Sequence, residues 1–387
     1  LEQAPSLAAR KARVEAAELS SRAAGVLPNP MVEFEYRDYN FPSYTIGSDP
    51  MSMAGFGVRQ DLRSKGRRAA ERDIAQAEVA TRRAEQHEAA FDLATAVRLQ
   101  YARLFALDRE RDTLENAREL VSMLEATTSS RYAAGQSDQA SVLRVQLEQS
   151  RIGQRLVDIA RDRFAAQTAI NRLTNDPPER PIGTVTTLPD AALPAAVAAG
   201  AAPGPRDAPS LLVRQREVEL AGTQVNAARQ ELGIAWSVGG GFYWQGGFNR
   251  TVNFVVGLEL PIRRNSKQKP LIASAEQALR ASQLELQDAT AEVRAETARL
   301  VNEWQTATEQ IERYQSAILP QNSAAFDATR SSYLAGRGDF VSVLEEFRRW
   351  VDVRTELAAR QADRYSAVVR LQSILGHQGS DTGSSQS

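Results

Sequence analysis

Few side chains in this chain of 387 residues could carry out chemistry. Cysteine is absent, so no thiolate nucleophile, thiolate metal site or disulfide can form. The two histidines, His87 and His377, have no second ligand residue at metal-binding spacing. Met51 and Met53 carry thioethers that could bind soft metal ions, but methionines beside a strand are more often packing residues. These residue types predict a protein that is not an enzyme and that holds no cofactor and no metal site.

The glycine run at 239–241 is the segment most like a phosphate-binding loop. It lacks the Lys-Ser/Thr pair of such loops and does not lead into a predicted helix. Glycines inside a strand instead permit a bend or close packing. The net charge of −1 gives no overall basic excess, so the sequence predicts no nucleic-acid partner.

Long helices dominate the predicted secondary structure. No proline lies between Pro50 and Pro177, and a helix over residues 67–131 would be about 95 Å long at 1.5 Å per residue. Few globular cores could bury such a helix, so we expect a coiled coil or a helical barrel. The sequence has no stretch of about 18 apolar residues, and any membrane contact is therefore expected from strands.

The chain contains two copies of one unit. Residues 132–143 return 201 positions later at 333–344, with seven of twelve residues identical, where chance would give about one match. Both copies contain the motif Tyr-x-x-Gly-x-x-Asp, formed by Tyr132, Gly135 and Asp138 and by Tyr333, Gly336 and Asp339. Its glycines suit the left-handed position that ends a helix, and its aspartates, or Ser137 in the first copy, suit the N-cap of the next. The motif predicts a helical hairpin turn in each copy.

Both turns are followed by a coiled-coil pattern. Positions spaced alternately three and four apart over 142–173 are apolar at eight of ten places. The same seam recurs over 343–374, and it keeps an interrupting arginine, which is Arg163 in the first copy and Arg364 in the second. The repeat is therefore structural and extends well beyond the motif.

Period-two alternation of apolar and polar residues predicts four strands, at about 31–41, 54–62, 234–245 and 251–262. They form two hairpins, one in each copy. Aromatic residues on or near these strands are candidates for a girdle at a lipid boundary: Tyr36, Tyr39, Phe41, Trp236, Tyr243 and Trp244. Trp304 and Trp350 fall on predicted helices and are expected in the core.

The predicted fold class is α+β, mainly α, with duplicated long antiparallel helical hairpins. In chain order we expect a first short helix (1–28), a β-hairpin (29–63), a long helical hairpin with its tip near 132–138 (64–175), a connector (176–208), a second short helix (209–232), a second β-hairpin (233–263), a second long helical hairpin with its tip near 333–339 (264–375) and a disordered tail (376–387).

Four amphipathic strands cannot close a membrane barrel alone, because open edges leave backbone groups unpaired in lipid and the smallest single-chain barrels have about eight strands. Three protomers would supply twelve strands, and their long helices could close as a helical barrel. Oligomerisation would therefore resolve the open edges.

The order of these elements resembles the TolC-type outer-membrane efflux factors, and so do three segments. They are Leu27-Pro28-Asn29-Pro30, Ile318-Leu319-Pro320-Gln321 and the second tip from Tyr333 to Leu344. The resemblance implies a passive homotrimeric conduit: a β-barrel in the bacterial outer membrane, an α-barrel through the periplasm, and a closed end that meets a periplasmic adaptor and an inner-membrane pump. The first hairpin has Asp49-Pro50-Met51 before its second strand. In this it is similar to the branch of the family that serves heavy-metal pumps of the resistance-nodulation-division type.

The resemblance also implies a periplasmic gate just after the second turn, where the family has acidic residues. Ser342 and Glu345 occupy those positions, and Ser141 and Arg144 occupy the equivalent ones in the first copy. Three copies of Glu345 could form a ring that favours cations, and Arg144 could pair with Glu345 to hold the tip shut. Glu345 could equally do no more than solvate a helix surface. The two turns would dock the adaptor.

Two other interpretations stay open. The chain could be the outer-membrane channel of a drug-efflux or type I secretion system rather than of a metal pump. A soluble coiled-coil scaffold would explain the heptads equally well, but it explains poorly why an amphipathic hairpin recurs at the same point of each copy.

Overall fold

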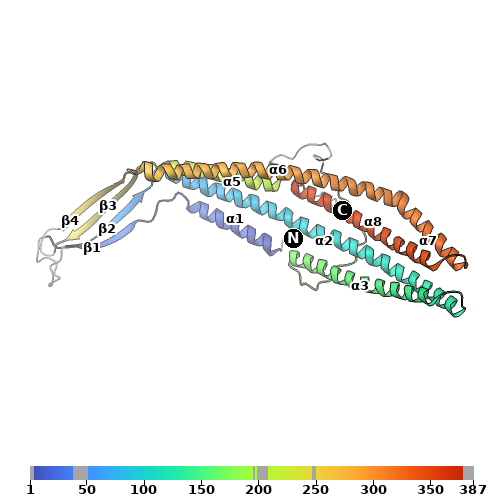
Figure 1. Ribbon diagram of the computed structural model, residues 1–387. Coiled ribbons are helices and arrows are strands. Elements are labelled where there is room, and N and C mark those ends of the chain that lie inside the picture. The colour runs from blue at the N-terminus through green and yellow to red at the C-terminus, as the bar shows by residue number, and fades with distance from the viewer. Residues whose placement is uncertain (1–3, 38–50, 195–196, 198–207, 246–249, 378–387) are drawn as a thin grey trace, which may run out of the picture. The chain divides into compact units, whose positions relative to one another are not determined.

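The computed structural model describes residues 4–37, 51–194, 197, 208–245 and 250–377 (Figure 1). Its elements, in chain order, are α1 (Pro5–Ala23), β1 (Met31–Arg37), β2 (Met53–Leu62), α2 (Lys65–Ala133), α3 (Gln139–Thr174), α5 (Pro209–Gln230), β3 (Ala235–Trp244), β4 (Arg250–Glu259), the π-helical turn η1 (Arg264–Gln268), α6 (Lys269–Arg313), the π-helical turn η2 (Tyr314–Ile318), α7 (Leu319–Leu334) and α8 (Phe340–Ile374). The mainly helical fold with four strands is confirmed. Asp49 and most of the predicted tail lie outside the described residues.

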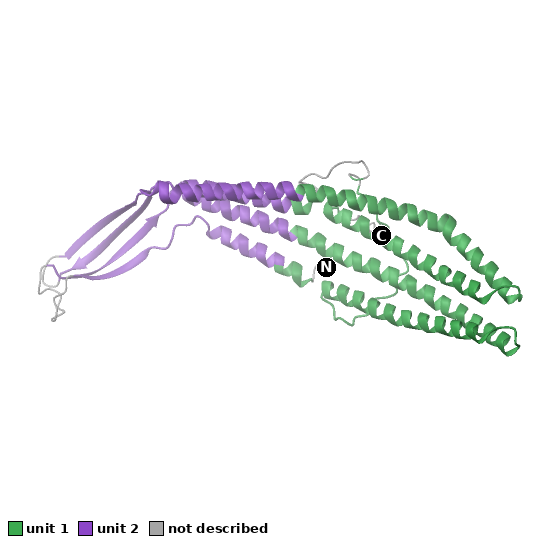
Figure 2. Ribbon diagram, in the orientation of Figure 1, with its two compact units in different colours: residues 1–9, 87–211, 290–387 green, residues 10–86, 212–289 purple. Residues whose placement is uncertain are grey.

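The chain forms two compact units (Figure 2). Unit 1 comprises residues 1–9, 87–211 and 290–387, and unit 2 comprises residues 10–86 and 212–289. None of the described helices combines the length and the apolar composition needed to cross a lipid bilayer.

Unit 2 carries an antiparallel sheet in the order β1-β2-β3-β4. Its register places Phe34 beside Phe56, Phe56 beside Phe242 and Phe242 beside Val252, so these side chains share one face. That face is mainly apolar along all four strands, with Gln60 and Arg250 as exceptions, and it is exposed in the single chain, where Phe254 is 86% exposed. Small and polar residues predominate on the opposite face, which also carries Met31, Met53 and Val255 and is called the polar face below. The alternation in the sequence thus becomes a sheet with two chemically different faces.

The sheet divides the candidate girdle residues between its faces. Tyr36, Trp236 and Trp244 lie on the apolar face, whereas Tyr243 lies on the polar face and is only 7% exposed. The girdle prediction was therefore wrong for Tyr243, because successive residues of a strand point to opposite sides and Tyr243 cannot share a face with its neighbour. The other two candidates, at 39 and 41, lie outside the described residues.

Unit 1 is built around two apolar clusters. One lies where α2, α3, α7 and α8 meet, and it includes Val145, Ile152 and Ile159 of the predicted seam. Trp350 packs against it half-buried. The other joins α2, α3 and α8 to the connector through Val185. The heptad pattern therefore identified the buried face of α3 correctly.

Both π-helical turns lie just before a proline, Pro270 after η1 and Pro320 after η2. Proline has no N–H to donate, and its ring clashes with the carbonyl four residues back. A π turn is one way in which a helix accommodates the missing hydrogen bond and the clash. The first copy has no proline at the place that matches Pro320, and α2 is continuous there.

Candidate functional site

The two helical hairpins of unit 1 end in turns of the same geometry. Gly135 and Gly336 have φ values of 69° and 78°, in the left-handed region that glycine tolerates best. The N–H of Gln136 donates to the carbonyl of Arg131 at 2.8 Å, and the second copy repeats this bond at 3.0 Å. This is the bonding that closes a helix at a left-handed glycine. The predicted hairpin turns are confirmed.

An aspartate caps the helix that follows each turn. Asp138 accepts the N–H of Ser141 at 2.9 Å, and Asp339 accepts those of Val341 and Ser342 at 3.1 and 3.3 Å. Hydrogen bonds from the Ser141 side chain and backbone hold the pKa of Asp138 below its ordinary value. Both caps were predicted, and in the first copy the aspartate rather than the serine before it is the cap.

The two tyrosines of the repeated motif differ in environment. Tyr333 is 3% exposed, and its hydroxyl lies 3.0 Å from the Thr128 hydroxyl. Arg131 stacks over the Tyr333 ring at 4.4 Å and donates to the carbonyl of Leu334 at 3.3 Å. These contacts fasten the second tip to the end of α2. Tyr132, by contrast, is 48% exposed.

The second copy supplies most of the aromatic core near the tips, and the first copy is polar at the same places. Phe326 and Phe347 pack with ring centroids 6.1 Å apart. Their counterparts 201 residues earlier, Glu125 and Gln146, form an exposed hydrogen bond of 3.2 Å instead. Phe340 and Trp350 likewise correspond to Gln139 and Gln149. The sequence analysis missed this division, although alignment of the copies position by position would have revealed it.

The predicted gate residues lie on the first two turns of α3 and α8. Ser342, Glu345 and Arg144 are exposed, whereas Ser141 is buried. Among the described residues of one chain, Glu345 and Arg144 take part in no ion pair, with each other or with a third residue. A pair between these two side chains, as predicted, would have to form between subunits.

An ion pair that the sequence analysis did not anticipate joins the two hairpins. Arg348 of α8 donates from Nε and Nη2 to the same oxygen of Glu148 on α3, at 2.9 and 2.6 Å. Glu148 is buried. Asp352, one turn further along α8, is an exposed residue. Partial desolvation of its carboxyl group raises its pKa, and the charges of Glu356 and Glu148 raise it further against the opposing charge of Arg348.

The interrupting arginine of the first seam fixes the connector. Asp108 is fully buried and accepts hydrogen bonds from Arg163 Nε and from the N–H of Val185, both at 2.8 Å. Arg163 also donates to the carbonyls of Ile182 and Gly183 at 2.8 and 3.0 Å. The charge is therefore paired and bonded on several sides, as a buried carboxylate requires.

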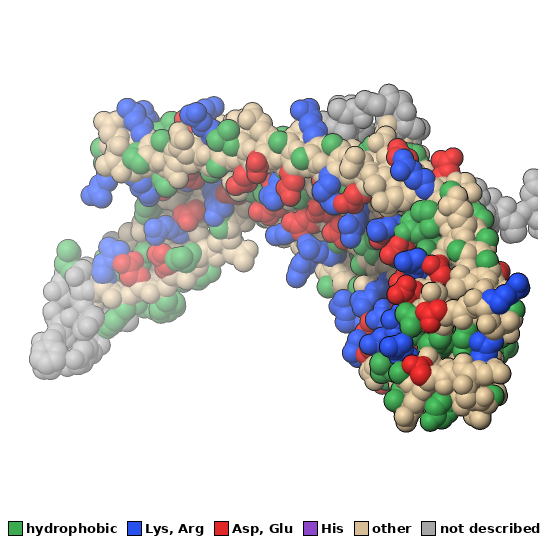
Figure 3. All heavy atoms as spheres, turned by 45° about the vertical axis from the view of Figure 1, so that its right-hand side comes forward, with side chains coloured by type: hydrophobic (Ala, Val, Ile, Leu, Met, Phe, Trp, Pro, Cys, Tyr) green, Lys and Arg blue, Asp and Glu red, His purple; other side chains and the backbone are tan. Residues whose placement is uncertain are grey.

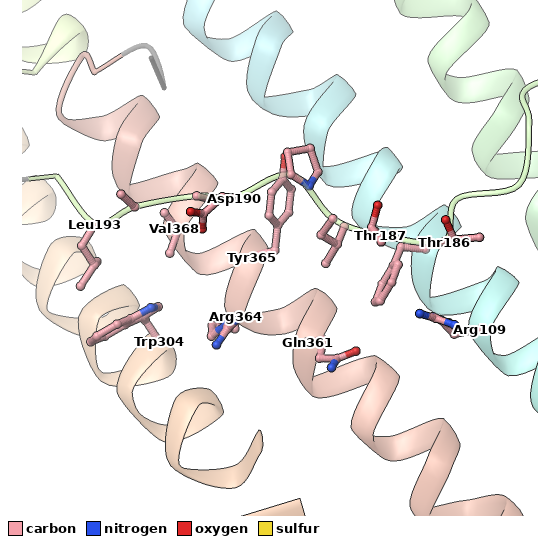
Figure 4. A pocket seen from close by; sticks show the side chains of 15 residues that line it. Arg109, Thr186, Thr187, Asp190, Leu193, Trp304, Gln361, Arg364, Tyr365 and Val368 are labelled. Carbon is pink, nitrogen blue, oxygen red and sulfur yellow. The ribbon is translucent and has the colours of Figure 1, made fainter. Parts of the chain in front are cut away.

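The second interrupting arginine lines a cavity beneath the same connector (Figure 4). This cavity of about 690 Å³ lies among α2, α6, α8 and residues 186–193, and Arg364, Arg109 and Trp304 line it. Trp304 is half-buried, and Tyr365 beside it accepts a hydrogen bond from Arg98 at 3.3 Å. Both seam arginines therefore lie near the connector. Arg163 donates hydrogen bonds to it, and Arg364 lines the cavity beside it.

Nothing in the described part of the chain gathers three histidine, aspartate or glutamate side chains as a metal site would require. His87 packs edge-on against Phe91 with centroids 5.0 Å apart. His377 contacts the carbonyl of Leu375 at 3.0 Å. Both histidines therefore have ordinary structural contacts.

The end of the tips carries few charged side chains on the face that Figure 3 shows, whereas charged side chains of both signs gather further along the helices. Exposed charges are nevertheless present in the turns, at Asp138, Arg337 and Asp339. Exposed apolar residues of this surface are Tyr132, Leu143, Leu334 and Val341. The tips therefore combine rigid turns with a small apolar surface.

The sequence model described as outer membrane efflux protein matches residues 1–176 and 206–377. Curated protein sequences give no significant match. Among solved structures the chain is similar to the outer membrane protein VceC of Vibrio cholerae, with a TM-score of 0.82 at 18% identity over 97% of this chain and 94% of that one. It is similar to CusC, with a TM-score of 0.83 at 16% identity over 98% and 90%. It is also similar to the open MtrE channel of Neisseria gonorrhoeae, with a TM-score of 0.76 at 17% identity over 97% and 87%.

Proposed function

Because the chain belongs to the outer membrane efflux protein family, we propose that three copies of it close into a duct that carries solutes from the periplasm across the outer membrane. Members of this family are passive outer-membrane channels and not enzymes, and they work as trimers with an adaptor and an inner-membrane pump. The chain is accordingly an outer-membrane protein that extends into the periplasm.

The observation that carries closure is an apolar stripe on α3 that nothing in the single chain covers. Positions 143, 150, 157 and 164 are seven residues apart and read Leu, Ser, Val and Phe, with Phe164 54% exposed. The matching positions of α8 are Leu344, Val351, Ala358 and Tyr365. Of these, Leu344 and Tyr365 are buried in the clusters that α2 completes.

Repeat symmetry indicates what covers the α3 stripe. Within one chain, α2 of the first copy covers α8 of the second. The equivalent contact would place the second-copy helices α6 and α7 of a neighbouring subunit against α3. Such head-to-tail contacts use different surfaces of each subunit and close a ring when the rotation permits.

The tip residues support the same arrangement. Tyr333 meets Thr128 within one chain, and the positions 201 residues away in the repeat, Tyr132 and Thr329, are the same residue types. Tyr132 is exposed and Thr329 is half-buried. We infer that Tyr132 contacts Thr329 of the partner subunit, which repeats the intrachain contact across the interface.

At the closed end, the proposed gate consists of Glu345 and Ser342 together with Arg144 and Ser141. Three exposed Glu345 carboxylates around the axis would favour cations. Their charge would be offset by Arg144 of a neighbouring subunit when the end is shut. As exposed pairs these would each contribute about 0 to 1 kcal/mol, which suits an end that must open.

For adaptor docking we propose the tip turns around Gly135 and Gly336, with the exposed side chains of Asp138 and Asp339. Tyr132 and Tyr333, also expected there, would act through the shape of the tips, because Tyr333 is buried and Tyr132 is assigned above to the subunit contact. The support is the exposed backbone of both turns. Gly336→Trp should abolish co-purification with the adaptor while the trimer persists. Ala335→Trp probes the same surface without a left-handed φ, since Ala335 has φ −78°.

Gly183→Trp is a matched control for this docking test, because it adds the same ring at an exposed connector position where an added Cβ meets nothing within 4 Å. It should leave adaptor binding intact. Adaptor retained by both tip variants would contradict the docking proposal.

For the solute we propose metal ions driven by a resistance-nodulation-division pump, on the strength of the segment Asp49-Pro50-Met51. The likeness to CusC and that to VceC have nearly equal TM-scores, so the fold favours neither branch. Growth of a deletion strain on copper or silver salts and on drugs tests the proposal. Sensitivity to drugs alone would favour the drug-efflux alternative.

A further inference from the structure

We propose that Tyr243 sets the open width of the β-barrel bore near its outer mouth. Gly55 and Gly241 leave room for its ring to lie flat against the barrel wall. The inference rests on the proposed function, because it takes the polar face of the sheet to line the bore. Tyr243 is next to the last residue of β3 and pairs with Thr251 near the start of β4, so it lies at the hairpin end of the sheet.

Tyr243 does not stand off the sheet as strand side chains usually do. Tyr243 is only 7% exposed, and its ring atoms lie close to the backbone of Gly55 and Gly241. The ring therefore lies along the sheet surface.

Glycines make room for the ring. A Cβ added to Gly55, on the neighbouring strand β2, would lie 2.5 Å from Tyr243 Cδ1. A Cβ added to Gly241, two residues earlier on the same face of β3, would lie 2.7 Å from Cε2. Both distances are well below the carbon–carbon contact distance of about 3.5 to 4.0 Å. The ring therefore occupies the space that a side chain at position 55 or 241 would need.

Two charged residues of β1 hold the ring in this place. The Tyr243 hydroxyl donates to Glu35 at 2.9 Å, across the intervening strand β2. Arg37 lies 6.0 Å from the ring centroid and pairs with Glu35 at 2.6 Å. The ring is therefore confined by glycine backbone on one side and by a bonded Glu-Arg pair on the other.

The consequence concerns the free bore. A flat ring leaves the bore open, whereas a ring forced to stand upright in each of three subunits would project into it at one level. Gly241 is the position that controls this, because an added Cβ would meet only the side chains of Tyr243 and Asn253 within its nearest contacts. Its φ is not in the left-handed region, so alanine there strains no backbone and displaces the tyrosine.

The test uses the absence of native cysteine. Ser237→Cys places a thiol on the polar face of β3, on the helix side of Tyr243, and intact cells are labelled from outside with a small maleimide or a polyethylene glycol maleimide. Adding Gly241→Ala should slow labelling by the polymer at least fivefold and leave labelling by the small reagent unchanged. Gly57→Ala is the matched control, because its Cβ would lie at an ordinary 3.8 Å from the Tyr243 hydroxyl, and it should have no effect.

Removal of the ring should reverse the effect, so Gly241→Ala combined with Tyr243→Ala should label with the polymer as fast as the parent. Unchanged polymer labelling in Gly241→Ala would overturn the inference, and so would slow labelling that persists without the tyrosine. A thiol at 237 that even the small reagent cannot reach would instead show that the polar face does not line the bore. That result would overturn the proposed function and this inference with it.

Discussion

At the scale of single residues, the sequence predicts contacts between near neighbours in the chain but not ion pairs between distant residues. The glycine and aspartate of each turn were predictable, because backbone conformation and capping depend on residues a few positions apart. Arg163 was visible only as an interruption of an apolar seam. Its buried partner Asp108 lies 55 residues away on another helix, and no local pattern identifies such a pair.

Asp352 gives a prediction at this scale. Its pKa is raised from 3.8 by partial desolvation of its carboxyl group and by nearby acids, so the folded chain binds this proton more tightly than the unfolded chain does. Stability contributed by this group is present at low pH and is lost as pH rises through the folded pKa. Asp352→Asn should therefore raise the melting temperature at pH 7, and the gain should disappear below about pH 4.

Thermal unfolding of the detergent-solubilised protein at several pH values measures this effect. Asp363→Asn on the same helix is the control, because Asp363 is exposed like Asp352 but pairs with Arg360 at 3.3 Å, and exposed pairs contribute little. Equal gains for both variants at every pH would contradict the account.

At the scale of elements, the two copies have the same turns and seams, but the second copy supplies most of the aromatic side chains that pack near the tips. Period and turn chemistry predicted the helices, the strands and the buried face of α3, because those patterns are local. They did not show that second-copy aromatics fill the core near the tips, because that difference appears only when the two copies are aligned position by position. The π turn before Pro320 was likewise missed, because a proline in a helical pattern suggests an end or a kink rather than a widened turn.

Phe347 and its repeat counterpart Gln146 form a matched pair of test sites. Phe347 is 1% exposed and packs on Phe326, so Phe347→Ala should lower the free energy of unfolding by about 3 to 5 kcal/mol. Gln146 is exposed, and Gln146→Ala should change it by no more than about 0.5 kcal/mol. Denaturant titration of both variants compares them, and similar losses would show that the copies share the core evenly.

At the scale of the whole molecule, one chain is incomplete in a consistent way. An apolar sheet face, the α3 stripe and Tyr132 are all exposed. The second-copy counterparts of the stripe, on α8, and of Tyr132, at Tyr333, are covered. The sequence predicted the need for closure from four strands that cannot close alone. It did not predict which helix faces would meet, because the covered and uncovered stripes have similar composition.

Cross-linking across the inferred Tyr132–Thr329 contact tests this closure most directly. Tyr132→Cys with Thr329→Cys, treated with a short bifunctional maleimide, should give a covalent ladder that ends at three times the 42.4 kDa chain. Thr128→Cys with Tyr333→Cys, the equivalent pair at 3.0 Å between hydroxyls in the parent chain, should cross-link within one chain and give no ladder. If the first pair cross-links only within a chain, or not at all while the second pair does, the ring of repeated contacts is contradicted.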